Sequence, residues 1–107
     1  MGSEETHIQH AEVKMMQAEF LQGPERASLL AEAKDDLLRA ERIVPGCGSW
    51  PLACIAAQLD QEALCRKWLE RARKAGTLPP HDELANHHHL AAMRDRPWFA
   101  KFLRRLA

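Results

Sequence analysis

The sequence predicts an all-α fold, a short stack of antiparallel helix hairpins closed by a C-terminal capping helix. The 107 residues include no Tyr, β-branched residues are scarce, and good helix formers such as Ala, Leu, Glu and Arg dominate. No segment shows the apolar–polar alternation that marks a strand. Apolar residues recur instead at spacings of three and four, and Gly-Pro and Pro-Gly pairs interrupt that pattern, as expected between helices.

The first two expected helices, 5–22 and 25–43, form one hairpin. Gly23 and Pro24 separate them, because Gly suits the end of a helix and Pro suits the first turn of the next. A Pro-Gly pair at 45–46 ends the second helix. The apolar stripes of the two helices are Ile8, Ala11, Met15, Ala18 and Leu21 in the first and Leu30, Ala33, Leu37, Ala40 and Val44 in the second.

The next two expected helices, 50–59 and 61–75, form a second hairpin. Ser49 and Asp60 are suitable N-caps, and Gly76 suits the left-handed position after the last turn. Small residues flanked by large ones occupy the faces where the helices would meet, which allows the two backbones to approach closely. These residues are Leu52, Ala53, Ala56, Ala57 and Leu59 in the first helix and Cys65, Trp68, Leu69 and Ala72 in the second.

The C-terminal part is expected to cover the end of the stack. After a loop at 77–80, a short helix over 82–92 is capped by Asp82, and the last helix starts after Asp95 and runs through residue 106. An apolar stripe at helical spacing marks the buried face of this last helix. It consists of Trp98, Phe99, Phe102, Leu103 and Leu106.

An internal repeat relates the two hairpins. Ala33, Leu37 and Ala40 reappear 32 residues later as Cys65, Leu69 and Ala72. A period in the thirties with helix–turn–helix content is typical of helical solenoids. Together with the proline at position 45, this pattern resembles that of the tetratricopeptide repeat family.

The C-terminal segment adds to this resemblance. Leu-Ala-Cys at 52–54, Trp-Leu-Glu-Arg-Ala at 68–72 and the pattern Leu-x-x-Met-Arg-x-x-Pro-x-Phe at 90–99 resemble the variant that closes the C-terminal end of such arrays. Two departures are Asp60, where the family usually has Gly, and Cys65, where it usually has Ala. The resemblance implies a single domain over 1–107, divided into a diverged first helix pair (5–44), a second repeat (49–76) and a C-terminal cap (81–107).

The function that this resemblance implies is protein–protein interaction. The chain would be a non-catalytic adaptor, chaperone-like protein or assembly factor that binds a peptide or protein partner in a helical groove. Trp50 is either the anchor of that groove or a core residue, and both interpretations stay open. Two repeats are few for a solenoid, so we expect self-association, or a partner that covers the open N-terminal end. The groove-facing positions are Cys47, Trp50, Cys54, Ala57 and Gln58.

An alternative function is that of a metal- or redox-linked accessory protein that uses the histidines and Cys47. The consecutive residues 87–89 are all His, but side chains one apart on a helix point about 100° apart, so they converge on one ion only if the segment is not helical. His7 and His10 are three residues apart, yet no further ligand stands at a fixed spacing for a tetrahedral site. We therefore expect solvated histidines, no metal and no cofactor.

Charge and cysteine content exclude several classes of function. The 15 Lys and Arg residues balance the 15 Asp and Glu residues, which removes the general electrostatic case for nucleic acid or an anionic membrane as partner. No apolar run approaches the ~20 residues that span a bilayer. The three cysteines lack metal or redox spacing and fit a reducing cytoplasm. We therefore expect a cytoplasmic protein. Because the sequence has no oxyanion motif, we also expect that the protein is not an enzyme.

Overall fold

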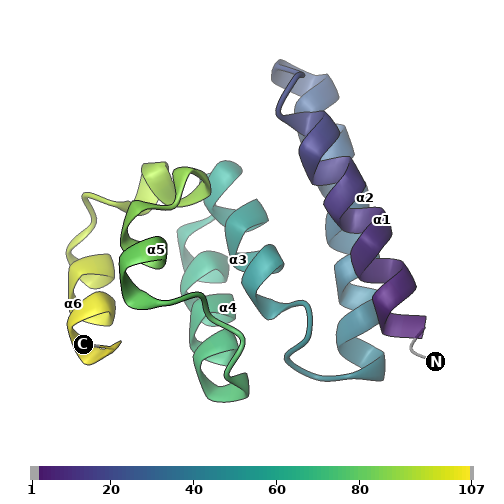
Figure 1. The fold of residues 1–107 in the computed structure, drawn as a ribbon. Helices are drawn as coiled ribbons and strands as arrows, with labels where there is room; N and C mark the ends of the chain where they lie inside the picture. The colour runs from purple at the N-terminus through teal and green to yellow at the C-terminus, as the bar shows by residue number, and fades with distance from the viewer. Residues whose placement is uncertain (1–2, 107) are drawn as a thin grey trace.

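The computed structural model describes residues 3–106, and most of this length is helical (Figure 1). The described residues contain no strand, which confirms the predicted all-α class. In the described part of the chain, no helix combines the length and the apolar character needed to cross a membrane. The elements are α1 (Ser3–Ala18), α2 (Gly23–Ile43), α3 (Ser49–Gln58), α4 (Glu62–Ala75), α5 (His81–Asn86), the 3-10 helix η1 (His88–Met93) and α6 (Pro97–Leu106).

The elements lie side by side in a flat array that measures 34 × 34 × 21 Å. The antiparallel hairpin of α1 and α2 forms one end of the array, and α6 forms the other (Figure 1). Helix α3 lies between them and contacts α2, α4 and η1. It is therefore the central element of the molecule.

One continuous apolar core connects the two ends of the array. Its middle is α3, where every side chain from Leu52 to Ala57 is buried. Cys65, Leu69 and Ala72 of α4 are also buried. The predicted small-residue contact between these two helices is confirmed, and its alanine and cysteine side chains allow the close approach.

The α1–α2 hairpin buries the predicted stripe of α2 at Leu30, Ala33, Leu37 and Ala40. The expectation for Val44 is wrong. Helix α2 ends at Ile43, the backbone of Val44 is extended, and its side chain is 42% exposed.

A buried carboxylate also ties α1 to α2. Asp36 of α2 accepts hydrogen bonds from Lys14 Nζ at 2.7 Å and from Arg39 at 3.2 Å. Lys14 belongs to α1, so this charge pair joins the two helices. The pairing compensates the Asp36 charge where the side chain is almost fully buried.

The junction between the two hairpins is organised by Glu41, near the end of α2. Its carboxylate accepts hydrogen bonds from the backbone N–H groups of Gly46 at 3.0 Å and Gly48 at 2.7 Å, and from Ser49 Oγ at 3.0 Å. The prediction of Ser49 as an N-cap is wrong. Helix α3 has Gly48 as its N-cap with no side-chain cap, because the buried Ser49 hydroxyl points to Glu41 instead.

Other helix ends differ in part from expectation. Helix α1 ends at Ala18 rather than at residue 22. Gly76 is the predicted left-handed C-cap, with φ of 74°. Asp60 is not the cap of α4, since the N-cap is Gln61. Asp60 itself has φ of 56°, a left-handed conformation that explains why glycine suits this position.

The prediction of a single helix over 82–92 is wrong. The chain leaves the helical conformation at His87, where φ is −66° and ψ is 128°, and resumes as η1. Arg94 stabilises this break by donating hydrogen bonds to the carbonyl of His87 at 2.9 Å and to that of Ala85 at 3.2 Å. The guanidinium thus satisfies carbonyls that a continuous helix would have used itself.

Candidate functional site

The predicted groove residues divide between the surface and the core. Cys47, Trp50 and Gln58 are half-buried. Cys54 and Ala57 are buried, so their side chains are not accessible to a partner in this conformation. A groove along α3 therefore stays a prediction that depends on Trp50 and Gln58.

The Trp50 side chain lies between the apolar core and His87, the residue at which the helix is interrupted. It packs against the apolar core cluster, and its ring meets that of His87 edge-on, at 5.1 Å between centroids and 86° between planes. Trp50 thus contributes to packing and also orients the His87 ring.

Trp50→Ala is expected to lower the free energy of unfolding by about 2 kcal/mol, below the 3–5 kcal/mol typical of a fully buried Trp. The reason is that the Trp50 side chain is only half-buried. Urea denaturation followed by circular dichroism measures the change, with Trp50→Phe as the ring-preserving control, for which we expect a loss of about 1 kcal/mol. A loss below about 0.5 kcal/mol for the alanine variant, the range of ordinary surface substitutions, would contradict a packing role.

Cys47 is not in an activating environment. Its thiol lies 3.4 Å from the carbonyl oxygen of Ala40, to which it donates. Burial, and secondly the negative charge of Glu41, raises the pKa of the Cys47 thiol. A thiol that stays protonated is a poor nucleophile, so the structure does not favour a redox role for Cys47.

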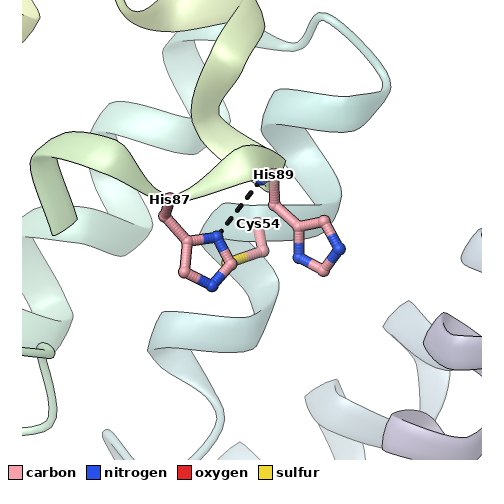
Figure 2. A group of neighbouring side chains, drawn as sticks. All are labelled: Cys54, His87 and His89. Carbon is pink, nitrogen blue, oxygen red and sulfur yellow. Dashed lines mark hydrogen bonds between the residues drawn. The ribbon is translucent and has the colours of Figure 1, made fainter. Parts of the chain in front are cut away.

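A different cysteine meets the histidines. Cys54 of α3, His87 at the chain break and His89 of η1 each offer one potential ligand atom, and these three atoms all lie within 4.8 Å of one another (Figure 2). We call these three residues the Cys–His cluster. The cluster forms because the backbone is not helical at His87, and this allows residues 87 and 89 to face α3 together.

Glu19, in the turn after α1, faces His88 and His89 from the first hairpin. Its Oε1 atom is 2.8 Å from His88 Nε2 and 3.2 Å from His89 Nε2. The hydrogen bond from His88, followed by that from His89, lowers the pKa of Glu19. Glu19 is therefore an ionised acceptor that fixes the orientation of the His89 ring.

The Cys–His cluster is uncharged at neutral pH. Burial lowers the pKa of both His87 and His89, so both imidazoles are neutral. Burial also raises the pKa of the Cys54 thiol, which stays protonated. Neutral imidazoles present the lone pairs that a metal ion or a hydrogen-bond donor requires.

His7 and His10 do not join a comparable site. Between residues 3 and 106, groups of three or more potential ligands occur only in the Cys–His cluster and in Glu19, His88 and His89. The histidine pair on α1 therefore has no third ligand within reach among the described residues.

The second unusual surface is an exposed apolar stripe at the open end of the array. Val13 and Met16 of α1 and Phe20 in the following turn are 54%, 63% and 85% exposed. Val13 and Met16 lie on one side of α1, opposite the buried Ala11 and Ala18, and Phe20 continues their spacing of three and four residues just beyond the end of the helix. The spacing is visible in the sequence, but the sequence analysis considered only the buried stripe of this helix and made no assignment for these three residues.

Two arginines of the C-terminal segment form ion pairs within the molecule. Arg96 contacts Asp60 at 3.0 Å and Glu62 at 3.1 Å. Arg105 contacts Glu70 at 2.6 Å. These ion pairs join α6 and the residues before it to α4, so these two guanidinium groups serve internal contacts.

Comparison with protein-family models, with curated proteins and with solved structures finds no match to this chain. The function is therefore inferred from the geometry of the two surfaces just described, the apolar stripe on α1 and the Cys–His cluster beside α3.

Proposed function

We propose that the protein is a non-catalytic protein-binding module, and that its partner docks on the apolar stripe of Val13, Met16 and Phe20. The observation that carries this proposal is the 85% exposure of the Phe20 side chain in line with two other exposed apolar residues. Contiguous exposed apolar surface is a common mark of protein–protein contact sites. An aromatic ring and a flexible Met are also residue types that interfaces favour.

The fold supports this choice of surface. Helix α1 packs along α2, and its outer side has no covering element among residues 3–106. A partner helix laid along α1 would extend the array by one more layer. Such a partner would provide the covering of the open N-terminal end that we expect if the chain is a short repeat array.

The chemistry of the partner follows from the charges beside the stripe. Glu5 and Glu12 are exposed on α1 and lie along one edge of the stripe at helical spacing. An amphipathic partner helix with apolar residues at i, i+3 and i+7 and basic residues beside them would match both features. We therefore propose a separate protein with such a helix, rather than a second copy, as the occupant.

The resemblance to tetratricopeptide repeats supports the same class of function, as an adaptor or assembly factor. The three cysteines form no disulfide, which fits the proposed cytoplasmic location.

Site-specific photo-crosslinking tests the docking surface. A photo-reactive phenylalanine analogue at position 20 is expected to give one discrete adduct with another protein in native lysate, because the largely exposed Phe20 side chain would lie within the contact. The same analogue at the exposed Lys101 on α6 is the matched control and is expected to give none. Met16→Ser is expected to reduce the yield at position 20 about tenfold, since loss of one anchor weakens binding by about 1–2 kcal/mol.

The identity of the crosslinked segment decides the proposal. A basic amphipathic helix in the adduct, found by mass spectrometry, would support it. An adduct with a second copy of this chain would contradict the separate partner, and equal adducts from positions 20 and 101 would contradict the docking surface.

A further inference from the structure

We propose that the Cys–His cluster of Cys54, His87 and His89 binds one divalent transition-metal ion, with zinc as the expected metal and solvent as the fourth ligand. The site is independent of the apolar stripe on α1. It would place a metal between α3 and the segment that joins α5 to η1.

The donor set selects this class of ion. One thiolate and two imidazoles suit zinc and related borderline-soft metals, whereas Mg²⁺ and Ca²⁺ prefer oxygen ligands. Three protein ligands with an open fourth position are a common arrangement for zinc. Within the cluster itself there is no carboxylate, which argues further against the hard cations.

The geometry requires only small movements. A tetrahedral zinc ion with ordinary bond lengths separates its sulfur and nitrogen ligands by roughly 3.4–3.6 Å. The three ligand atoms are already within 4.8 Å of one another. Figure 2 shows the Cys54 side chain between the two imidazole rings, so modest rotations of the rings would close the site around an ion.

The ring nitrogen of His89 that would not bind the ion already has a hydrogen-bond partner, as in many metal sites. Its Nε2 is 3.2 Å from the ionised carboxylate of Glu19, which accepts its proton in a hydrogen bond. The Nδ1 lone pair is then the one left for the ion. Metal-binding histidines usually donate their other ring N–H to a carboxylate or carbonyl, which fixes the tautomer and the ring orientation.

His87 is held by three neighbours. Its Nδ1 accepts a hydrogen bond from the backbone N–H of His89 at 3.2 Å, so Nδ1 is the unprotonated nitrogen, and an ion would replace this donor. Trp50 meets the ring edge-on, and Arg94 holds the His87 carbonyl at 2.9 Å. The contacts with Trp50 and Arg94 do not involve Nδ1 and would stay in place when the ion binds.

Binding of the metal ion releases one proton. The ion displaces the proton of the Cys54 thiol to form a metal–thiolate bond, and that proton goes to solvent. The two imidazoles are neutral and lose no proton on binding.

The group formed by Glu19, His88 and His89 is the main competitor, because it shares His89. It lacks a sulfur ligand, and Glu19 and His88 are both exposed. In that group the Glu19 oxygen already lies within hydrogen-bond distance of both imidazoles. The buried thiol therefore favours the Cys–His cluster.

Titration of the reduced full-length protein with Co²⁺ tests the proposal. We expect one equivalent to bind with a dissociation constant of about 10 μM or tighter, within the range of ordinary specific binding. A thiolate-to-cobalt charge-transfer band in the near ultraviolet should appear, and Zn²⁺ should abolish it by displacement. Cys54→Ala should remove the band, and His89→Gln should weaken binding at least 100-fold.

Matched controls separate this site from its competitor. Cys65→Ala removes another buried thiol, and His88→Gln removes the competing group, so both should retain the band. Glu19→Gln should weaken binding about tenfold without abolishing the band, as expected for a positioning residue.

Several results would overturn the proposal. These are absence of the band in the wild type, its persistence in Cys54→Ala, or a loss of binding in His88→Gln that Cys54→Ala does not cause. Should circular dichroism show that Cys54→Ala is unfolded, the half-buried His89→Gln decides: tight binding with the band intact in that variant contradicts the site.

Discussion

Glu41→Ala is expected to lower the free energy of unfolding by about 3 kcal/mol, the combined effect of losing charge-assisted hydrogen bonds and leaving their donors without a partner. The Glu41 carboxylate accepts from two backbone N–H groups and one hydroxyl of the loop that joins the hairpins. Gly46, Gly48 and Ser49 are all buried, so water cannot readily replace the lost acceptor. Urea denaturation measured by circular dichroism gives the change.

Glu32→Ala is the matched control for Glu41→Ala. Glu32 lies on the same helix, is exposed, and has Lys14 at 3.9 Å as its ionic neighbour. Its removal is expected to change stability by about 0.5 kcal/mol or less, as for other surface pairs. Equal effects of the two substitutions would show that the junction does not depend on the Glu41 carboxylate.

Gly46→Ala, in the same junction, is also expected to destabilise the protein by about 3 kcal/mol, from backbone strain of ~1–2 kcal/mol and a steric contact of similar size. Gly46 has φ of 95°, and a Cβ atom placed on it would be 2.4 Å from the Cβ of Ala75. Neither atom is the end of a flexible side chain, so the loop or the end of α4 must shift. Urea denaturation again provides the measurement.

Gly76→Ala separates the two causes. Gly76 has φ of 74°, but a Cβ there would meet no atom within 4 Å. This variant should therefore show only the backbone contribution, about 1–2 kcal/mol. The double variant Gly46→Ala with Ala75→Gly should recover part of the loss, and failure to do so would mean that the contact with Ala75 is not the source of the extra strain.

Local sequence signals were sufficient for the class of the fold and for most helix positions. Pro24 and Gly76 mark real helix ends because each acts on the backbone of its own turn, whereas Gly23 begins α2 and does not end α1. The alanines and cysteines between α3 and α4 were also identified correctly, since a small residue at helical spacing indicates close packing. Ser49 was misassigned because its hydroxyl is directed to Glu41, a tertiary contact that overrides the local capping preference.

The Cys–His cluster could not be predicted in the same way. Nothing like Gly or Pro marks the chain break at His87, which depends on Arg94 and on packing against α3. Cys54 and His87 are far apart in the sequence, and Glu19 is 70 positions from His89. The sequence analysis required a non-helical backbone for the histidines to converge, and the structure shows such a backbone at His87, which brings His87 and His89, but not His88, to Cys54.

The enclosed position of α3 also has a consequence for biosynthesis. The helix Ser49–Gln58 contains no charged residue, and seven of its ten residues are buried. One of its covers, η1, begins only at His88, so α3 emerges from the ribosome well before the segment that shields it. During that interval the nascent chain exposes an apolar, uncharged helix, a state in which chains are prone to aggregate, until η1 packs against it.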